Sequence, residues 1–151
     1  AAGGWYADKG SPTNYLCLPP DPISSGKTPT TYNHVYGVEY ESNFWGPHSS
    51  NEDAPCAVCA STSGSKLLMI PGRDTCYSGW TKQYSGYLGT EYKEHLGPKE
   101  YVCVDQNPEY LNAGERDVDG ALFYPVSYQC GALQCPPYIG NEVVNCVVCT
   151  Q

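Results

Sequence analysis

A short acidic run carries residue types and a spacing that could bind a metal ion. Glu115-Arg-Asp117-Val-Asp119-Gly120 matches the opening of a calcium-binding loop, where acidic residues alternate and a glycine permits a sharp turn. The match is partial, because the position that an EF-hand fills with a bidentate glutamate falls on Val126, and no flanking helices are predicted. The alternative is a solvated acidic turn. We expect Glu115, Asp117 and Asp119 to be oxygen ligands of one calcium ion.

A calcium ion with open coordination positions could accept the vicinal hydroxyls of a sugar, which are neutral oxygen donors. Sugars also have an apolar C–H face that stacks on tryptophan or tyrosine, and the chain has three tryptophans and fourteen tyrosines. Binding residues concentrate in loops, although an aromatic residue there can equally belong to the core or to the rim. The carbohydrate-contacting residues expected from the sequence are Asn107, Glu109, Tyr110, Arg116 and Trp45. The loop around Trp45 and Asp53 is the second candidate location.

Motifs for catalysis are absent from the sequence. It contains neither G-x-S-x-G nor H-E-x-x-H, and its histidines, His34, His48 and His95, are scattered. Carboxylates are numerous, but no spacing selects a pair for acid–base chemistry. We therefore expect a binding protein rather than an enzyme.

The segments that must hold these loops come in two copies. Six residues between Gly3 and Pro22 recur 86 positions later, between Gly89 and Pro108. The run 36–40 then corresponds to 124–128, and the C-x-x-C pair 56–59 to 146–149. We expect one domain over residues 1–151, built of a first repeat at about 1–60 and a second at about 76–151. The two subdomains should be related by an approximate two-fold axis.

Short β-type runs dominate both repeats, and helical signals are scarce. Several runs alternate apolar and polar residues, as half-buried strands do. The fold class expected is mainly β and disulfide-rich, with short strands and long irregular loops at 23–32, 44–53 and 107–120. The first-repeat counterpart of the acidic loop, residues 23–33, contains no acidic residue. The expected strands lie in 15–18, 34–41, 57–60, 66–70, 100–104, 121–129 and 142–148.

Nine cysteines indicate disulfides and an oxidising compartment, and the odd number leaves one thiol without a partner in the chain. If each repeat is self-contained, that thiol is Cys56 or Cys59. If the C-x-x-C of the first repeat pairs with Cys76, it is Cys146 or Cys149. The thiol is either buried and free or, as we expect, joins two chains in a disulfide-linked homodimer.

The two C-x-x-C pairs have other conceivable roles. Four thiolates could hold a structural zinc ion, but the pairs lie too far apart in the sequence for a zinc ribbon, and both lie in apolar β-type runs. A thioredoxin-like role needs a helix after the motif, and neither motif has one. Structural disulfides remain the favoured interpretation.

Charge and hydropathy exclude two classes of partner. The net charge is −8, whereas binding to a nucleic-acid backbone needs a basic patch. No apolar stretch approaches 18 residues, so no membrane insertion is expected. The chain opens Ala-Ala-Gly-Gly, with neither an initiator methionine nor a signal peptide. We expect a processed, secreted, extracellular protein.

Ten motifs along the chain resemble one domain type, the globular domain of short-chain collagen-like proteins of sponges, cnidarians and molluscs. The likeness covers about residues 15–149, and the sequence is most similar to galactose-binding, calcium-dependent lectins of sea anemones that form disulfide-linked dimers. It carries no Gly-X-Y tract, and where such domains usually have small and amide residues it has the acidic run 115–119. The motifs are YLCLP (15–19), VYGVEY (35–40), PCAVC (55–59), LMIPG (68–72), CYSGW (76–80), YSGY (84–87), YVCVD (101–105), NPEY (107–110), LFYP (122–125) and CPPY (135–138).

The resemblance implies a lectin for terminal galactose-type sugars that binds galactose-containing glycans through calcium. The alternative is a structural extracellular-matrix module, derived from a collagen-like protein, that binds protein partners. Agglutination of red cells that galactose and EDTA both block would distinguish the two.

Overall fold

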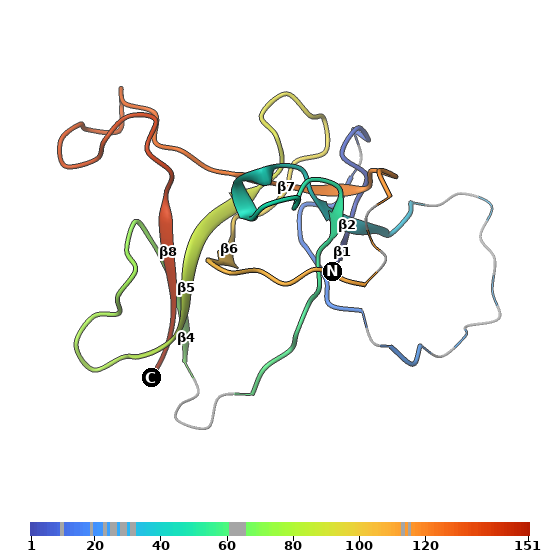
Figure 1. Cartoon of the computed structure of the whole chain (residues 1–151), viewed down its shortest axis with the longest axis horizontal. Coiled ribbons are helices and arrows are strands. Elements are labelled where there is room, and N and C mark those ends of the chain that lie inside the picture. The colour runs from blue at the N-terminus through green and yellow to red at the C-terminus, as the bar shows by residue number, and fades with distance from the viewer. Residues whose placement is uncertain are drawn as a thin grey trace.

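The chain folds into a curled sheet of short strands joined by long loops (Figure 1). The computed structural model describes residues 1–9, 11–18, 20–22, 24, 27, 30, 33–60, 66–112, 114 and 116–151. These residues contain eight strands and one 3-10 turn, with no α-helix. The prediction of a mainly β, disulfide-rich fold is therefore confirmed. The elements are β1 (Ala2–Gly3), β2 (Tyr36–Tyr40), the turn η1 (Asn43–Trp45), β3 (Glu52–Asp53), β4 (Leu67–Pro71), β5 (Thr81–Thr90), β6 (Val102–Asp105), β7 (Ala121–Pro125) and β8 (Asn145–Thr150).

The strand order mixes the two halves of the sequence. It runs β1-β2-β7-β5-β8-β4, with β3 added beside β2 and β6 beside β5. The pairing of β2 with β7 is parallel, and the other strand pairs are antiparallel. The parallel pair places Val38 beside Ala121 and so joins the first repeat to the loop that precedes β7. Two separate subdomains are not visible in this order, and the internal two-fold axis stays a prediction.

Most of the expected strand segments overlap a strand. Segments 34–41 and 121–129 contain β2 and β7, whereas β4, β6 and β8 extend one or two residues beyond segments 66–70, 100–104 and 142–148. Segment 15–18 contributes a single bridge, between Leu16 and Ala2, and segment 57–60 forms no strand. None of the described residues forms a helix of the length and hydropathy needed to span a membrane.

The longest strand, β5, was not predicted. Its sequence, TKQYSGYLGT, is polar and contains two glycines, which disfavour strands. Gly86 is needed there because a Cβ atom at this position would collide with the backbone of β6, starting with the carbonyl oxygen of Val104. The close approach of β6 therefore requires glycine.

The main core packs on one face of β2. Val38 and Tyr40 lie on that face, and Trp45 from η1 packs with them at 4% exposure. The indole Nε1 of Trp45 donates a hydrogen bond to the carbonyl oxygen of Phe123 (3.1 Å), which fixes the ring. Successive side chains of a strand point to opposite faces. Glu39 and Glu41 therefore point away from this core.

Four disulfides join cysteines of the chain, a feature typical of extracellular proteins. Cys17–Cys56 and Cys103–Cys146 join equivalent positions of the two repeats. Cys76 pairs with Cys149, whereas Cys59, the first-repeat equivalent of Cys149, is free and exposed. The unpaired thiol is thus one of the two expected if each repeat is self-contained. The remaining bond, Cys130–Cys135, closes a short loop in the second repeat.

Candidate functional site

Three carboxylates converge on the face of β2 opposite to the main core. Glu39 lies in β2, Glu41 directly follows it, and Asp117 belongs to the loop before β7. One oxygen atom from each of the three lies within 4.8 Å of the other two. Calcium–oxygen bonds are about 2.3–2.6 Å long, so ligand oxygens on one ion are at most about 5 Å apart. The three groups could therefore hold one metal ion.

Two oxygens of this cluster are buried and have no hydrogen-bond partner among the described residues. The Glu39 side chain is 1% exposed, and its Oε2 accepts no hydrogen bond from any described residue. Oε1 of Glu41 is also buried and unpaired within the described part of the chain. Native proteins pair nearly all buried polar groups, and an exception needs an explanation such as an ion. Asp117 is exposed, so the cluster opens to solvent on the side of Asp117.

A tight turn brings the acidic loop over Glu39. Asp119 has φ +56° and Gly120 has φ +143°, both in the left-handed region. Asp and Gly tolerate this conformation better than most residues. A Cβ atom at position 120 would lie 2.5 Å from the carbonyl oxygen of Gly37, so the turn needs glycine where it crosses β2. The backbone of Val118 then forms a hydrogen bond to the Glu39 carboxylate.

The cluster is strongly electronegative. Burial raises the pKa of Glu39 to about 7, and the charges of Asp53, Glu41 and Asp119 contribute, against the lowering effect of the Val118 hydrogen bond. Burial is also the main reason that the pKa of Glu41 is raised. The negative charges of Asp117, Asp119 and Glu91 raise this pKa further, and His95 lowers it. A cation between the carboxylates would relieve this repulsion and compensate for the loss of water.

Aromatic side chains border the acidic cluster. Tyr124 follows Phe123 in β7, and the carbonyl oxygen of Phe123 accepts a hydrogen bond from the backbone N–H of Glu41 (3.2 Å). Burial raises the pKa of the Tyr124 hydroxyl to about 12, and the charges of Glu41, Glu91 and Asp119 contribute to this rise. Tyr92 packs on Tyr124 at 5.2 Å between ring centroids and is 38% exposed.

The buried carboxylate of Glu91 anchors this border. Its Oε1 lies 2.9 Å from Nδ1 of His95, and its Oε2 accepts a hydrogen bond from the backbone N–H of Leu122 (3.3 Å). The His95 ring also contacts Tyr92 and Tyr124. The border is therefore attached to β7, next to the acidic loop.

The donor set indicates the class of metal. All three ligand groups are carboxylates, and hard cations such as calcium, magnesium or manganese prefer oxygen ligands. No thiolate or imidazole belongs to the group, so the preferences of zinc or copper are not met. A hard divalent cation fits the site best.

Two of the three predicted metal ligands fall in or beside this cluster. Asp117 is one of its three members, and Asp119 lies close enough to raise the pKa of both glutamates. Arg116 is exposed at the surface of the same loop. Glu115, the third predicted ligand, lies outside the described residues.

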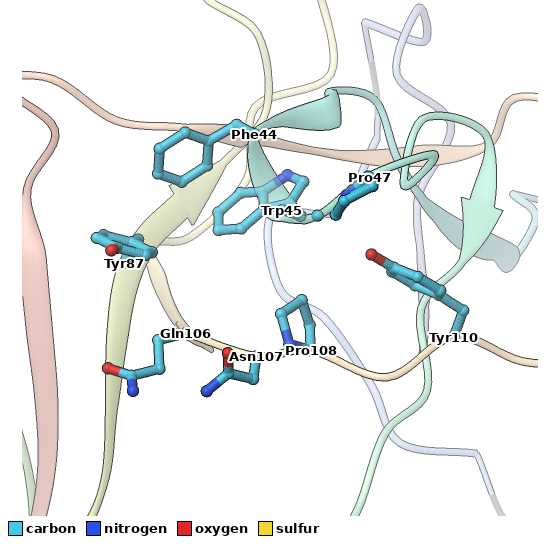
Figure 2. Close-up of a pocket in the computed structure, with 9 residues that line it drawn as sticks. Phe44, Trp45, Pro47, Tyr87, Gln106, Asn107, Pro108 and Tyr110 are labelled. Atoms are coloured by element: carbon cyan, nitrogen blue, oxygen red, sulfur yellow. The ribbon is translucent and has the colours of Figure 1, made fainter.

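The predicted carbohydrate contacts lie in a different place. Trp45, Asn107 and Tyr110 line a groove with a volume of about 410 Å³ (Figure 2). The ring of Tyr40 packs against Trp45 and Tyr110, so this groove lies toward the core face of β2. Glu109 is exposed, and its carbonyl oxygen accepts a hydrogen bond from the Tyr40 hydroxyl (3.5 Å). The structure therefore divides the expected residues between two faces of β2.

The sequence reasoning missed Glu39 and Glu41. A signal for them exists, because Val38-Glu39-Tyr40-Glu41 alternates apolar and acidic residues and so places both glutamates on one face of a strand. Their proximity to Asp117 depends on the parallel pairing of β2 with β7, which local sequence does not reveal. No protein-family model and no solved structure matches this chain.

Proposed function

We propose that this protein is a secreted lectin that binds a terminal galactose-type sugar through a calcium ion. Glu39, Glu41 and Asp117 hold the ion in this proposal, and Asp119 adds negative charge beside it. Calcium takes six to eight oxygen ligands, so three carboxylates leave positions for hydroxyl groups. Two neighbouring hydroxyls of one sugar can fill such positions together.

One observation carries the proposal. Glu39 is 1% exposed, and its Oε2 has no partner among the described residues, although it lies next to another buried and unpaired carboxylate oxygen, Oε1 of Glu41. A buried carboxylate without a partner costs free energy that a bound cation would return. Calcium is favoured over magnesium because magnesium requires near-ideal octahedral geometry and releases its water reluctantly.

The border of the cluster supports a sugar as the second ligand. The exposed part of Tyr92 offers an aromatic surface for the apolar C–H face of a sugar ring. Galactose has such a face on the side opposite to its axial hydroxyl. Tyr92 and Tyr124 therefore take the role that the sequence assigned to Trp45 and Tyr110.

Free Cys59 supports a dimeric lectin. It is exposed, and its neighbour Val58 is 87% exposed, so the thiol can meet another chain. A disulfide between two Cys59 side chains would place two sugar sites in one molecule. Two linked sites bind a surface rich in galactose more tightly than one.

Calorimetry with lactose tests the proposal. We expect a calcium-dependent component of the heat of lactose binding that excess EDTA removes and restored calcium recovers. Tyr92→Ala should weaken lactose binding without changing calcium binding, whereas Tyr101→Ala, which alters another exposed tyrosine outside the cluster, should change neither. Calcium binding without any lactose binding would favour the structural matrix module, and lactose binding that EDTA does not weaken would contradict the calcium bridge.

A further inference from the structure

We propose that the groove between η1, β5 and the loop after β6 is a second ligand site, which binds a neutral sugar ring without calcium. Its walls come from three separate segments: Phe44 to Pro47, Tyr87, and the loop after β6, which contributes Gln106 to Pro108 and Tyr110. Figure 2 shows Phe44 and Tyr87 together at one side and Tyr110 at the other, with Gln106 and Asn107 along the lower edge. The volume of about 410 Å³ lies within the range of about 300–1,000 Å³ for small-molecule sites.

The lining of the groove selects a neutral ligand. Its described residues are aromatic residues, prolines, a glycine and two primary amides, and none of them is charged although the whole chain has a net charge of −8. An anionic or cationic ligand would find no charged partner there. Aromatic rings stack on the C–H face of a sugar, and amides can both donate to and accept from hydroxyl groups. A neutral saccharide satisfies both kinds of contact.

The aromatic wall is held in place before any ligand arrives. The Phe44 ring contacts the Trp45 and Tyr87 rings edge-on, at centroid distances of 5.1 and 5.0 Å. The side chain of Ser42 accepts a hydrogen bond from the backbone N–H of Phe44 (3.1 Å), which caps the 3-10 turn. The hydroxyl of buried Ser49 lies within hydrogen-bond distance of the carbonyl oxygens of Ser42 (2.7 Å) and Gly46 (2.8 Å), the residues that flank η1. Phe44 is nevertheless 39% exposed, so its ring is available to a ligand.

The opposite wall is equally constrained. The backbone N–H of Asn107 donates to Oδ1 of Asp105 (2.8 Å), and the N–H of Gln106 donates to the carbonyl oxygen of Ser85 on β5 (3.3 Å). Tyr110 packs edge-on against Tyr40 at 5.6 Å. Its hydroxyl occupies the space that a Cβ atom at Gly46 would need. A preformed site loses less entropy on binding than a mobile one.

This site is separate from the acidic cluster. Tyr40 packs against the walls of the groove, while Glu39 and Glu41, its neighbours in the chain, point to the other face. None of the described residues that line the groove carries a carboxylate, so they offer no acidic metal ligand. The inference therefore does not rest on the proposed calcium site.

Nuclear magnetic resonance of the whole, isotope-labelled protein in excess EDTA tests the inference. Lactose and maltose serve as neutral probes, and glucuronate as the charged control. We expect the side-chain amide signals of Gln106 and Asn107 to shift with either neutral sugar and not with glucuronate. Asn107→Ala and Tyr87→Ala should each weaken this binding about tenfold, since one aromatic or hydrogen-bonding contact accounts for about that factor.

Two matched variants keep the outcome decisive. Asp117→Asn alters the acidic cluster only and should leave the shifts in EDTA unchanged. Asn107 is exposed, so Asn107→Ala stays interpretable even if Tyr87→Ala proves unstable. Absence of shifts with both sugars, or shifts that Asn107→Ala does not reduce, would each overturn the proposal.

Discussion

Glu39 on β2 lies directly across the antiparallel pair from Asp53 on β3. Like charges at directly opposed positions destabilise a sheet. Here the effect is larger than usual because Glu39 is buried and Glu41 and Asp119 add negative charge. The ammonium group of Ala1 lies near Asp53 and offsets part of the charge on that side only. The fold thus retains a repulsive arrangement that a cation at Glu39 would relieve.

The stabilising effect of calcium should increase with pH. Since the pKa of Glu39 is raised to about 7, the folded protein without metal holds a proton that the unfolded chain releases near the ordinary glutamate pKa of 4.5. The Glu39 contribution to the free energy of unfolding should therefore fall by roughly 3 kcal/mol between about pH 4.5 and 7. Calcium competes with that proton. Thermal unfolding at pH 5 and pH 8, with calcium and with EDTA, should show the larger difference at pH 8, and equal differences would contradict the site.

Replacing Glu39 by glutamine should separate stability from metal binding. Glu39→Gln keeps the shape of the side chain and removes its buried charge. We expect a higher melting temperature than wild type in EDTA at pH 8 and no further rise on adding calcium. Glu52→Gln is the matched control, because Glu52 lies on β3 opposite Tyr40 and outside the cluster. If Glu39→Gln melts lower than wild type in EDTA, the carboxylate has a stabilising partner that the structure does not reveal.

Asp117 and Asp119 should differ in their importance. Asp117→Asn removes an exposed carboxylate of the cluster and should abolish calcium-dependent lactose binding, with thermal stability in EDTA nearly unchanged. Asp119→Asn keeps a residue that tolerates φ +56°, so the turn should persist. Calorimetry should show weaker calcium binding for Asp119→Asn but not its loss. Normal calcium binding by Asp117→Asn would remove Asp117 from the ligand set.

Strands could be predicted from the sequence where apolar and polar side chains alternate. They could not be predicted where the close packing of two backbones determines which residues form the strand. Apolar and polar residues alternate in segment 34–41, which forms β2 and buries Val38 and Tyr40 in the core. Strand β5 gives no such signal, because the absence of a side chain at Gly86 is what lets β6 approach. A glycine required by a neighbouring strand looks, in sequence, like a glycine in a loop.

The acidic loop was predictable as a metal-binding candidate, but its partners were not. Asp117 lies in a recognisable run of alternating acids, whereas Glu39 and Glu41 lie in the other repeat. Only the parallel pairing of β2 with β7 and the turn at Asp119 and Gly120 bring the three together. Such contacts between distant segments depend on strand order, which no local pattern encodes.

The disulfides should differ in their contributions to stability according to the loops they close. Cys76–Cys149 spans 73 residues and includes a fully buried cysteine, whereas Cys130–Cys135 spans five residues near the surface. Loop-closure entropy predicts roughly 4 kcal/mol for the first and roughly 2 kcal/mol for the second. Denaturant unfolding of the paired alanine variants should therefore show the larger loss for Cys76→Ala/Cys149→Ala. Equal losses would mean that native contacts, rather than loop length, set these contributions.

Cys59 should link two chains. It is the one cysteine among the described residues without a disulfide, and it is exposed beside Val58, which is 87% exposed. In an oxidising compartment an exposed thiol is readily oxidised, and an identical thiol on a two-fold axis is the partner that closes a dimer. Electrophoresis without reductant should show twice the chain mass of 16.4 kDa, and reductant should return it to one chain. Cys59→Ser should run as a single chain in both conditions and keep calcium-dependent lactose binding, yet lose the agglutination of red cells that two linked sites produce. A wild-type monomer without reductant, or a Cys59→Ser variant that still runs as a dimer, would remove Cys59 from the interface.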